Sequence, residues 1–398
     1  MKKSRFGVRG LLVSAAVLLA GVLMAYVTLY APPASDRSVA TAGSREEGAL
    51  KDSQHPGLRL VGYSDVLDDR TFDGTNVGGL SALTYDPRRD LYYALVDREE
   101  ETDARFYTLR IPFEDGRLGG ITIFDVTELL DSTGRPFGAG RFDGEGLDVT
   151  SLGNLLVASE TGPAVFRFSL EGDLLEELPV PEKFLLPLLK EGDKIGDEDG
   201  GGQPNSTFEG LSLTPDGDTL FVALQKSLTP DSRNAVEPQR LRLLRYERRG
   251  LDDFRPSGEF FYMSDSLAGI GEIAAVSKDE LLVLEHGNQL FRTNLSGAED
   301  VSESQSLLSS AQEPLEKELV ADLRGCVPQG ESESPDSQAD TTPTDYEGMT
   351  FGPSLPSGGR ALVLVSDDDF DGGWKTRVLA LDAPARSVTG KAKDVTCR

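Results

Sequence analysis

Five segments of the chain share one pattern of polar and apolar positions. Each opens with a polar or acidic turn, continues as alternating small and apolar residues, turns at a Gly/Pro/Asp cluster, and returns as a strongly apolar run. The segments are residues 78–98, 143–160, 207–226, 269–286 and 345–368. Alternation followed by a turn and a second apolar run predicts a β-hairpin in each of them.

The return strands are nearly continuous apolar runs such as Leu220–Leu224 and Ala361–Val365, which is typical of strands covered on both faces. A third strand follows most of them, for example Leu241–Tyr246. The motifs start 62 to 76 residues apart, mostly with no long amphipathic helix between them. This repeat predicts an all-β fold, a β-propeller of five to six antiparallel blades. We expect a strand within Leu58–Val66 to complete the last blade.

The N-terminus predicts one transmembrane or signal helix before the propeller. Basic residues from Lys2 to Arg9 precede Leu11–Tyr30, which is apolar, free of charge and long enough to span roughly 30 Å as a helix. We therefore divide the chain into a signal anchor or signal peptide (1–30), a flexible tether (31–56) and the propeller (57–398). An uncleaved helix predicts single-pass anchoring in the cytoplasmic membrane with the propeller on the extracytoplasmic side; cleavage predicts an exported protein.

Charge narrows the set of partners. Lys and Arg total 40 against 67 Asp and Glu, which gives a net charge of −27 and argues against binding to nucleic acid. Cations, or small ligands held through cations, suit such a field. The chain has two cysteines, Cys326 and Cys397, too few for a Cys-rich zinc site, and we expect them to form a disulfide after export.

The repeat places acidic residues at equivalent positions, which a propeller brings together around its axis. The hairpins begin at Ser81, Glu145, Glu209, Glu272 and Glu347, and they end at Asp97, Glu160, Gln225, Glu285 and the Asp367/Asp368 pair. Carboxylates gathered in one funnel repel each other unless some are protonated or a cation lies among them.

A hard cation, Ca²⁺ first, is the simplest resolution of this repulsion. The predicted metal ligands are Asp97, Glu145, Glu160, Glu209, Glu272, Glu285, Glu347 and Asp367. Two alternatives remain open. The Glu-Gly turns can simply bind backbone N–H groups at strand ends, or two carboxylates can act directly as a general acid and base.

Four residues are candidates for catalysis: Glu209, Arg98, Lys226 and His286. Arg98, Lys226 and His286 each directly follow the residue that ends a hairpin, where Arg98 and Lys226 can grip an anionic group of a substrate. The alternative is that the charged groups are solvated loop residues and that His286 takes no part in chemistry.

Three of the segments carry a family resemblance. Residues 207–225 (TFEGLSLTPDGDTLFVALQ), 268–285 (AGIGEIAAVSKDELLVLE) and 346–370 (YEGMTFGPSLPSGGRALVLVSDDDF) resemble the bacterial phytase-like family labelled "esterase-like activity of phytase". The resemblance covers about residues 58–384. It implies an extracytoplasmic β-propeller named for the hydrolysis of phosphate esters or other esters. Similar sequences tend to have an acid where this chain has Gln225, and Arg where it has His286.

These observations predict a metal-dependent hydrolase of phosphate or carboxylate esters that acts on a small anionic or ester substrate. Two other hypotheses stay open: a non-catalytic binding or scaffold propeller with a structural ion, and a hydrolase of lactones or sugar acids.

Overall fold

The computed structural model describes residues 57–97, 103–138, 141–186, 201–232, 238–308, 311–325, 344–370 and 373–384. They belong to one unit, His55–Arg398. The predicted membrane or signal helix, the tether up to residue 56, and both cysteines lie outside these residues. Within the described residues, no helix has the length and apolar character that crossing a membrane requires.

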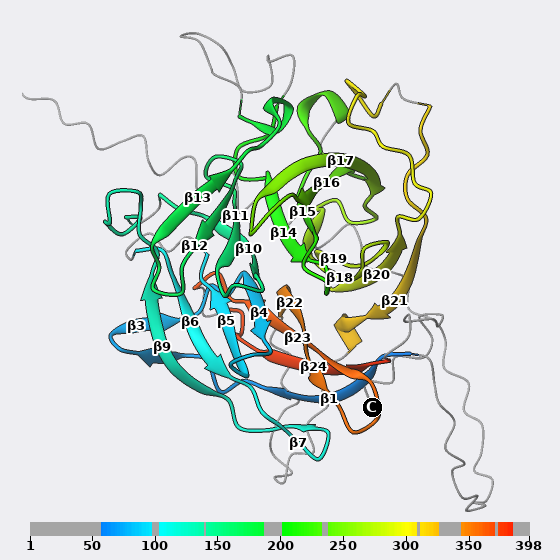
Figure 1. The fold of residues 1–398 in the computed structure, drawn as a ribbon. Coiled ribbons are helices and arrows are strands. Elements are labelled where there is room, and N and C mark those ends of the chain that lie inside the picture. Colours follow the sequence, from blue (N-terminus) through cyan, green and yellow to red (C-terminus); the bar gives the residue numbers. More distant parts are fainter. Residues whose placement is uncertain are drawn as a thin grey trace, which may run out of the picture. The chain divides into compact units, whose positions relative to one another are not determined.

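Five antiparallel sheets of four strands each surround a common axis, which makes the domain a five-bladed β-propeller (Figure 1). Blade 1 is β4 (Ala82–Asp86), β5 (Leu91–Leu95), β6 (Arg105–Arg110) and β9 (Thr122–Glu128). Blade 2 is β10 (Gly144–Val149), β11 (Leu155–Ser159), β12 (Ala164–Phe168) and β13 (Leu174–Leu178). Blade 3 is β14 (Phe208–Leu213), β15 (Thr219–Leu224), β16 (Arg240–Arg248) and β17 (Phe254–Met263).

The last two blades complete the circle. Blade 4 is β18 (Ile270–Ser277), β19 (Glu280–Glu285), β20 (Gln289–Asn294) and β21 (Lys317–Asp322). Blade 5 is β22 (Asp345–Ser354), β23 (Arg360–Asp367), β24 (Val378–Ala383) and the N-terminal β1 (Arg59–Ser64). Two small hairpins and three short 3-10 helices lie in the connections between the blade strands of the described residues: β2 (Arg70–Phe72) with β3 (Thr75–Val77), β7 (Phe113–Glu114) with β8 (Arg117–Leu118), η1 (Glu182–Phe184), η2 (Thr229–Asp231) and η3 (Leu323–Gly325).

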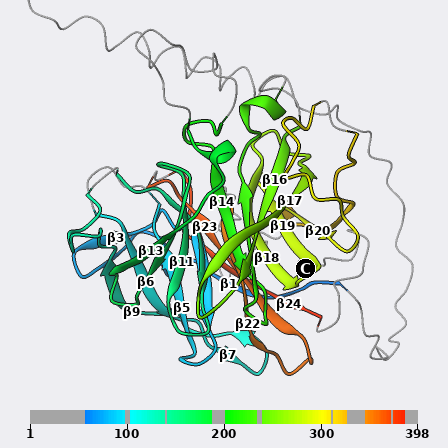
Figure 2. The ribbon, with the colours of Figure 1, turned by 45° about the horizontal axis from the view of Figure 1, so that its top comes forward.

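The ring closes as the sequence predicted. β1 pairs antiparallel with β24, with Leu60 opposite Leu381, so the first strand of the domain completes the last blade. The inner strands contact one another in the order β4, β10, β14, β18, β22 and back to β4, and Figures 1 and 2 show them around the axis. The sequence predicted five to six blades, and the described strands form five.

The second strand of each blade is buried along almost its whole length, as its apolar run predicted. β11 and β15 are examples, and Leu155, Val157, Phe221 and Val222 are fully buried in them. Apolar side chains on both faces of these strands pack against the neighbouring blades. This packing fixes the angle between blades and therefore the position of every strand end on the axis.

Glycine lets the inner strands approach each other closely. A Cβ on Gly210 of β14 would lie 2.6 Å from the backbone nitrogen of Ile273 on β18. A Cβ on Gly146 of β10 would lie 2.5 Å from the carbonyl oxygen of Glu209 on β14. Both distances are shorter than contact allows, so the glycine of the Glu-Gly motif is a packing requirement of a narrow five-bladed ring.

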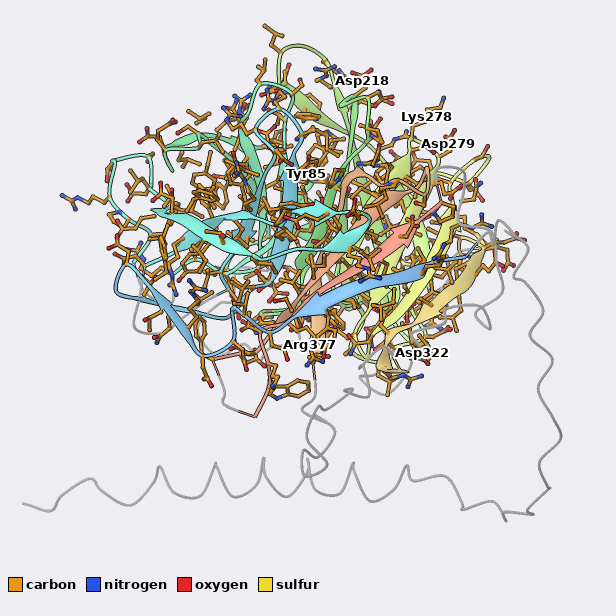
Figure 3. All side chains as sticks on the ribbon, turned by 90° about the horizontal axis from the view of Figure 1, so that it is seen from below. Tyr85, Asp218, Lys278, Asp279, Asp322 and Arg377 are labelled. Carbon is orange, nitrogen blue, oxygen red and sulfur yellow. The ribbon has the colours of Figure 1, made fainter. Side chains whose placement is uncertain are left out.

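The two ends of the propeller carry different sequence features. Figure 3 shows Tyr85, Asp218, Lys278 and Asp279 at one end and Asp322 and Arg377 at the other. The former lie at the end of β4 and in the turns β14–β15 and β18–β19, whereas Arg377 directly precedes β24. The acidic starts of the inner strands therefore lie toward the Arg377 end.

Candidate functional site

Matching backbone hydrogen bonds close the hairpins of blades 1 to 4 and define which residues are equivalent. In each blade the residue after the second strand donates its N–H to a carbonyl just before the inner strand, with N···O distances of 2.7 to 3.1 Å. The donor and acceptor pairs are Asp97 and Gly79, Glu160 and Asp143, Gln225 and Thr207, and His286 and Gly269. By this register His286, and not Glu285, is equivalent to Asp97 and Glu160, the carboxylates that end the hairpins of blades 1 and 2.

The inner strand of blade 4 also has a different residue at the position where blades 2 and 5 have a glutamate. The pairing of inner and second strands skips Glu145 in blade 2 and Glu347 in blade 5, and each sits in a β-bulge. In blade 4 the skipped residue is Gly271, while Glu272 pairs in register with Leu284. The His286 ring packs over Gly271, where an added Cβ would lie 3.6 Å from Cε1. Since a bulge changes the direction of the side chain it carries, Glu272 does not join the other glutamates.

Glu285, a predicted metal ligand, is fully occupied by protein donors. Its Oε1 accepts hydrogen bonds from Tyr262 Oη at 2.8 Å and Lys317 Nζ at 2.6 Å. Its Oε2 accepts from the backbone N–H groups of Asp265 and Ser266, both at 2.8 Å. A buried carboxylate with four donors stabilises the fold of blade 4 and has no need of a cation.

Glu272, also a predicted ligand, joins two blades. Its Oε1 accepts from Leu211 N on β14 at 2.9 Å and from Ile273 N at 2.8 Å. Burial raises its pKa well above the usual range, and these two bonds only partly oppose that effect. For this glutamate the structure matches the alternative interpretation, a carboxylate that binds backbone N–H groups at strand ends.

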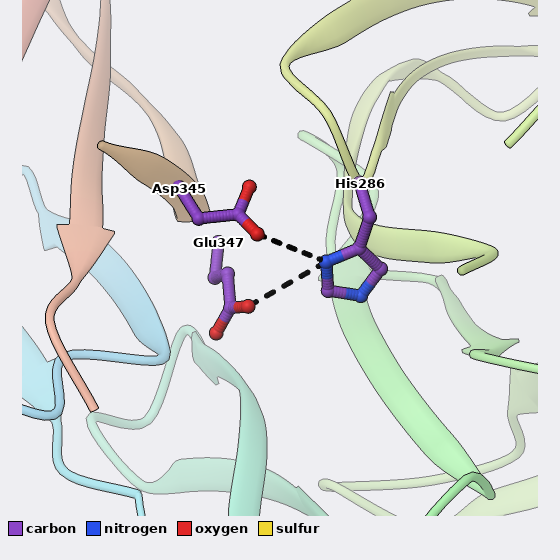
Figure 4. A group of neighbouring side chains, drawn as sticks. All are labelled: His286, Asp345 and Glu347. Carbon is purple, nitrogen blue, oxygen red and sulfur yellow. Dashed lines mark ion pairs between the residues drawn. The ribbon is translucent and has the colours of Figure 1, made fainter. Parts of the chain in front are cut away.

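His286 lies among three carboxylates, and Figure 4 shows two of them, Asp345 and Glu347, on the Nδ1 side of the ring. Its Nδ1 is 3.7 Å from Asp345 Oδ2 and 3.5 Å from Glu347 Oε1, and its Nε2 is 3.6 Å from Glu209 Oε1. Burial alone would lower the pKa of His286, but the three carboxylates raise it well above its usual range. The three carboxylates therefore favour the positively charged form of the imidazole.

Glu209 links this group to blade 2. Gln225 Nε2 donates to Glu209 Oε1 at 3.4 Å, and Thr207 N donates to Glu160 Oε1 at 3.0 Å. Burial, followed by the charge of Glu209, raises the pKa of Glu160 to about 9. Burial also raises the pKa of Glu209. With a pKa of about 9, Glu160 holds its proton at neutral pH.

Two further carboxylate groups share Asp97. Asp97 comes together with Asp143 and Glu145 on one side and with Asp367 and Asp369 on the other, with ligand atoms of each group within 4.8 Å of one another. Burial, then Asp97, Glu209 and other acids, raises the pKa of Glu145 well above its usual range. Burial raises the pKa of Asp367 to about 7. We call these residues, together with the His286 group, Gln225 and Glu160, the axial cluster.

The sequence prediction missed three members of this cluster. Asp143 and Asp345 lie two residues before Glu145 and Glu347, so blades 2 and 5 both carry the motif Asp-x-Glu-Gly. That shared spacing was a signal that could have identified them. Asp369 belongs to the stretch Asp367-x-Asp369-x-Asp371, whose pattern gives no indication that it lies against Asp97.

Three residues that the sequence placed at hairpin ends, Lys226, Arg98 and Asp368, are not among the members of the axial cluster. Lys226 Nζ donates to Ser206 Oγ at 3.1 Å, and Arg98 lies outside the described residues. Asp368, the neighbour of Asp367, accepts hydrogen bonds from Gly79 N at 2.7 Å and from Thr376 Oγ1 at 2.9 Å. Asp368 therefore ties blade 5 to blade 1.

An apolar ring lies below the axial cluster. Its members lie two positions after the residues that the sequence predicts at the start of each hairpin, and each is at most 3% exposed. They are Leu83, Leu147, Leu211, Ala274 and Met349. The same five residues line a cavity of about 340 Å³ toward the far ends of the inner strands. These apolar side chains lie between the cavity and the carboxylates at the starts of the inner strands.

The donor set fits a divalent cation. Glu209 Oε2 and Asp345 Oδ1 are buried and have no hydrogen-bond partner among the described residues. Glu209 is 3% exposed, whereas Asp345 is 31% exposed, so the group opens to solvent on the Asp345 side. The groups around Asp97 offer oxygen alone, which suits Ca²⁺; the imidazole nitrogen of the His286 group suits Mn²⁺ or Zn²⁺ better.

Comparison with known proteins identifies the family. The model of the family described as Phytase-like, esterase-like activity of phytase, matches residues 75–370. The chain belongs to this Phytase-like family. An uncharacterized secreted protein of Arthroderma benhamiae is 32% identical over 104 residues, which are 22% of this chain and 20% of that protein. The Phytase-like chain thus spans about a fifth of that relative's length.

Solved propellers resemble this Phytase-like protein at low identity. A putative 6-phosphogluconolactonase from Bacteroides uniformis is 14% identical with a TM-score of 0.34, and the match covers 81% of this chain and 74% of that chain. The periplasmic gluconolactonase of Pseudomonas aeruginosa is also 14% identical, with a TM-score of 0.31 and coverage of 79% and 87%.

Proposed function

We propose that this Phytase-like protein is an exported, metal-dependent hydrolase of phosphate or carboxylate esters and that its reaction takes place at the axial cluster. One observation carries the proposal. A buried imidazole has two carboxylates at one ring nitrogen, Nδ1, and a third carboxylate at the other. Metal-binding histidines in proteins have this arrangement, with one nitrogen toward the ligand set and the other donating to a supporting carboxylate.

The residues divide into ligands and supports. His286 Nδ1, Asp345 and Glu347 would hold the cation, and Glu209 would accept the Nε2–H and fix the orientation of the ring. A cation bound there supplies Lewis acidity, which polarises an ester oxygen and makes water a stronger acid. The groups around Asp97 would hold the Ca²⁺ that the sequence predicted.

Glu160 and Glu209 would move the protons. Glu160, with a pKa of about 9, holds a proton at neutral pH and would give it to the departing alcohol oxygen. Glu209 Oε2 has no hydrogen-bond partner among the described residues and would receive the proton of the attacking water. Lys226, and Arg98 if it faces the cluster, would attract the anionic part of a substrate.

Two observations support export. The charge-free segment Leu11–Tyr30 follows basic residues, and the relative from Arthroderma benhamiae is named a secreted protein. Either the segment stays as a membrane anchor, with the propeller on the extracytoplasmic side, or it is removed. Partners would be small esters or anions, and the net charge of −27 opposes nucleic acid.

The test begins with elemental analysis of the purified full-length protein. Hydrolysis of 4-nitrophenyl phosphate and 4-nitrophenyl acetate is then measured after treatment with EDTA and after separate addition of Mn²⁺, Zn²⁺ and Ca²⁺. We expect EDTA to abolish hydrolysis of one ester class and one of these ions to restore it. His286→Ala and Glu209→Gln should each lower kcat at least a hundredfold, because each removes a group that acts at the reacting atoms.

A matched control separates chemistry from folding. Glu247→Gln removes an exposed carboxylate on β16 and should leave both metal content and hydrolysis unchanged. Bound metal without any turnover would refute the hydrolase and leave a binding propeller with a structural ion. Full activity in His286→Ala would refute the assignment of the site.

A further inference from the structure

A polar cavity lies beside the axial cluster. Its volume is about 460 Å³, within the range of roughly 300–1,000 Å³ that small-molecule sites occupy. The β2–β3 hairpin and the segment that follows β23 form its walls. Its lining consists of Asp68, Asp69, Arg70, Thr71, Asn76, Val77, Asp368, Phe370, Trp374 and Lys375.

One turn joins this cavity to the axial cluster. Asp368 lines the cavity, while its two neighbours, Asp367 and Asp369, have their carboxylates beside that of Asp97. Gly79 holds the pieces together, because its N–H donates to Asp368 Oδ1 at 2.7 Å and its carbonyl accepts from Asp97 N at 2.7 Å. A molecule in the cavity is therefore separated from the Asp97 carboxylates by the width of a single turn.

The backbone of this turn is held in an unusual conformation. Asp369 and Phe370 have φ angles of 49° and 50°, the left-handed region that costs a residue other than glycine of order 1–3 kcal/mol. The Phe370 ring lies so close to Gly79 that an added Cβ there would be 2.3 Å from it. Tight packing against blade 1 thus maintains a strained turn whose successive side chains face two different sites.

The chemistry of the lining favours a sugar ring. Trp374, the chain's one tryptophan, is 37% exposed and presents an aromatic surface together with Phe370. Around these rings stand carboxylate, amide, hydroxyl and guanidinium groups. The C–H face of a pyranose packs on an aromatic ring while its hydroxyls bond to such groups. An aryl group would use the aromatic surface but leave the polar groups without partners.

The charge of the lining favours a neutral sugar. Three carboxylates, Asp68, Asp69 and Asp368, face two cations, Arg70 and Lys375. Lys375 is already paired, with Nζ 3.6 Å from Asp65 Oδ2 and 3.9 Å from Asp68 Oδ2. The balance is negative, so a uronic acid or a sugar phosphate is disfavoured relative to an uncharged hexopyranoside.

We propose that this cavity is a substrate subsite that binds an uncharged sugar ring and presents an ester on that ring to the axial cluster. The binding of the ring stands on the cavity alone. The presentation of the ester rests on the proposed hydrolase function.

The first experiment measures binding without catalysis. Methyl β-D-glucopyranoside, methyl β-D-galactopyranoside and methyl α-D-mannopyranoside are titrated into the full-length protein while tryptophan fluorescence is recorded. Because the chain has one tryptophan, a saturable change reports this cavity. We expect saturation with at least one neutral sugar, and at least fivefold weaker binding of glucuronate. Saturation with 4-nitrophenol and with no sugar would overturn the proposal, as would a fluorescence that stays unchanged throughout.

Variants locate the binding. By saturation-transfer NMR, Trp374→Ala should weaken binding of the same sugar at least tenfold, whereas Phe124→Ala, which removes an exposed aromatic residue of blade 1, should not. Unchanged binding in Trp374→Ala would overturn the proposal.

The catalytic part is tested separately. Trp374→Ala should lower kcat/KM for glucose 6-acetate at least ten times more than for ethyl acetate. Equal losses would refute the subsite as a determinant of ester choice. Sugar binding without hydrolysis of any ester would refute the proposed function but leave the binding site. Hydrolysis without sugar binding would refute the binding site but leave the proposed function.

Discussion

Asp148, a half-buried aspartate, provides the sharpest test of how the carboxylates of the inner strands shape stability. It lies on β10 three residues after Glu145 and joins three blades. Its Oδ1 accepts from Thr84 Oγ1 at 2.9 Å and from its neighbour Val149 N at 2.7 Å, and its Oδ2 accepts from Leu213 N at 2.7 Å. Burial nevertheless outweighs these bonds and raises its pKa from 3.8 to about 6.

The sign of the pH effect follows from this shift. The unfolded chain loses the Asp148 proton near pH 3.8 and the folded chain near pH 6. Between these values the folded state binds more protons, so the contribution of Asp148 to stability falls as pH rises and is constant above pH 6. A shift of about 2 units corresponds to a loss of at most about 3 kcal/mol across this window.

The perturbation is Asp148→Asn, which keeps the shape of the side chain but does not titrate. Its amide places a donor opposite Leu213 N, and this contact adds a pH-independent destabilisation of about 1–3 kcal/mol to the pH-dependent contribution of Asp148. Urea unfolding of both proteins with EDTA at pH 4, 5, 6 and 7, followed by Trp374 fluorescence, gives the difference in unfolding free energy. We expect this difference to shrink by up to about 3 kcal/mol between pH 4 and pH 6 and then to stay constant. Parallel curves for the two proteins at all four pH values would show that Asp148 is ionised throughout and refute the reasoning.

Two further predictions concern packing and charge. Gly210→Ala should destabilise the protein by about 2 kcal/mol or more, because the new Cβ would lie 2.6 Å from a backbone nitrogen of blade 4. Gly162→Ala has no atom within 4 Å of its Cβ and is the control; equal urea midpoints for the two would contradict the close approach of inner strands. Arg242→Met should cost about 3–5 kcal/mol, because it leaves the buried Asp231 and Glu259 without their common guanidinium partner. A loss below 1 kcal/mol in thermal or urea unfolding would show that water or protons replace that partner.

The sequence pattern predicted the hairpins and the closure of the ring because both depend on local alternation and apolar runs. It did not locate the outermost strand of most blades. β13, with the sequence LLEEL, and β9, with TIFDVTE, are half-exposed edge strands that bury few side chains. Their pairing depends on the strand already formed beside them, and periodicity within so short a segment does not distinguish them from loops.

The members of the axial cluster depend on a register that the sequence motif alone did not settle. Matched by its acidic residues, blade 4 places Glu272 and Glu285 in the ring. Aligned by its hairpin-closing hydrogen bond, it places Gly271 and His286 there instead. The order Gly-Glu-Ile, in place of Glu-Gly, puts a glycine at the bulge position that Glu145 and Glu347 occupy in blades 2 and 5, and it puts the glutamate one residue after the bulge.

This shift explains how one blade supplies a nitrogen to a site that the other blades build from carboxylates. With a glutamate at position 271 its side chain would occupy the space over which the His286 ring now packs, and the ring could not reach Asp345 and Glu347. The position of the His286 ring therefore depends on the glycine at position 271. Placing Glu at 271 and Gly at 272 together should restore the Glu-Gly order, put a glutamate in the bulge of blade 4 as in blades 2 and 5, and remove the imidazole from the cluster. The Nδ1 and Nε2 resonances of His286 in ¹⁵N NMR would report that change. A histidine that kept its raised pKa in this variant would show that the bulge does not control the site.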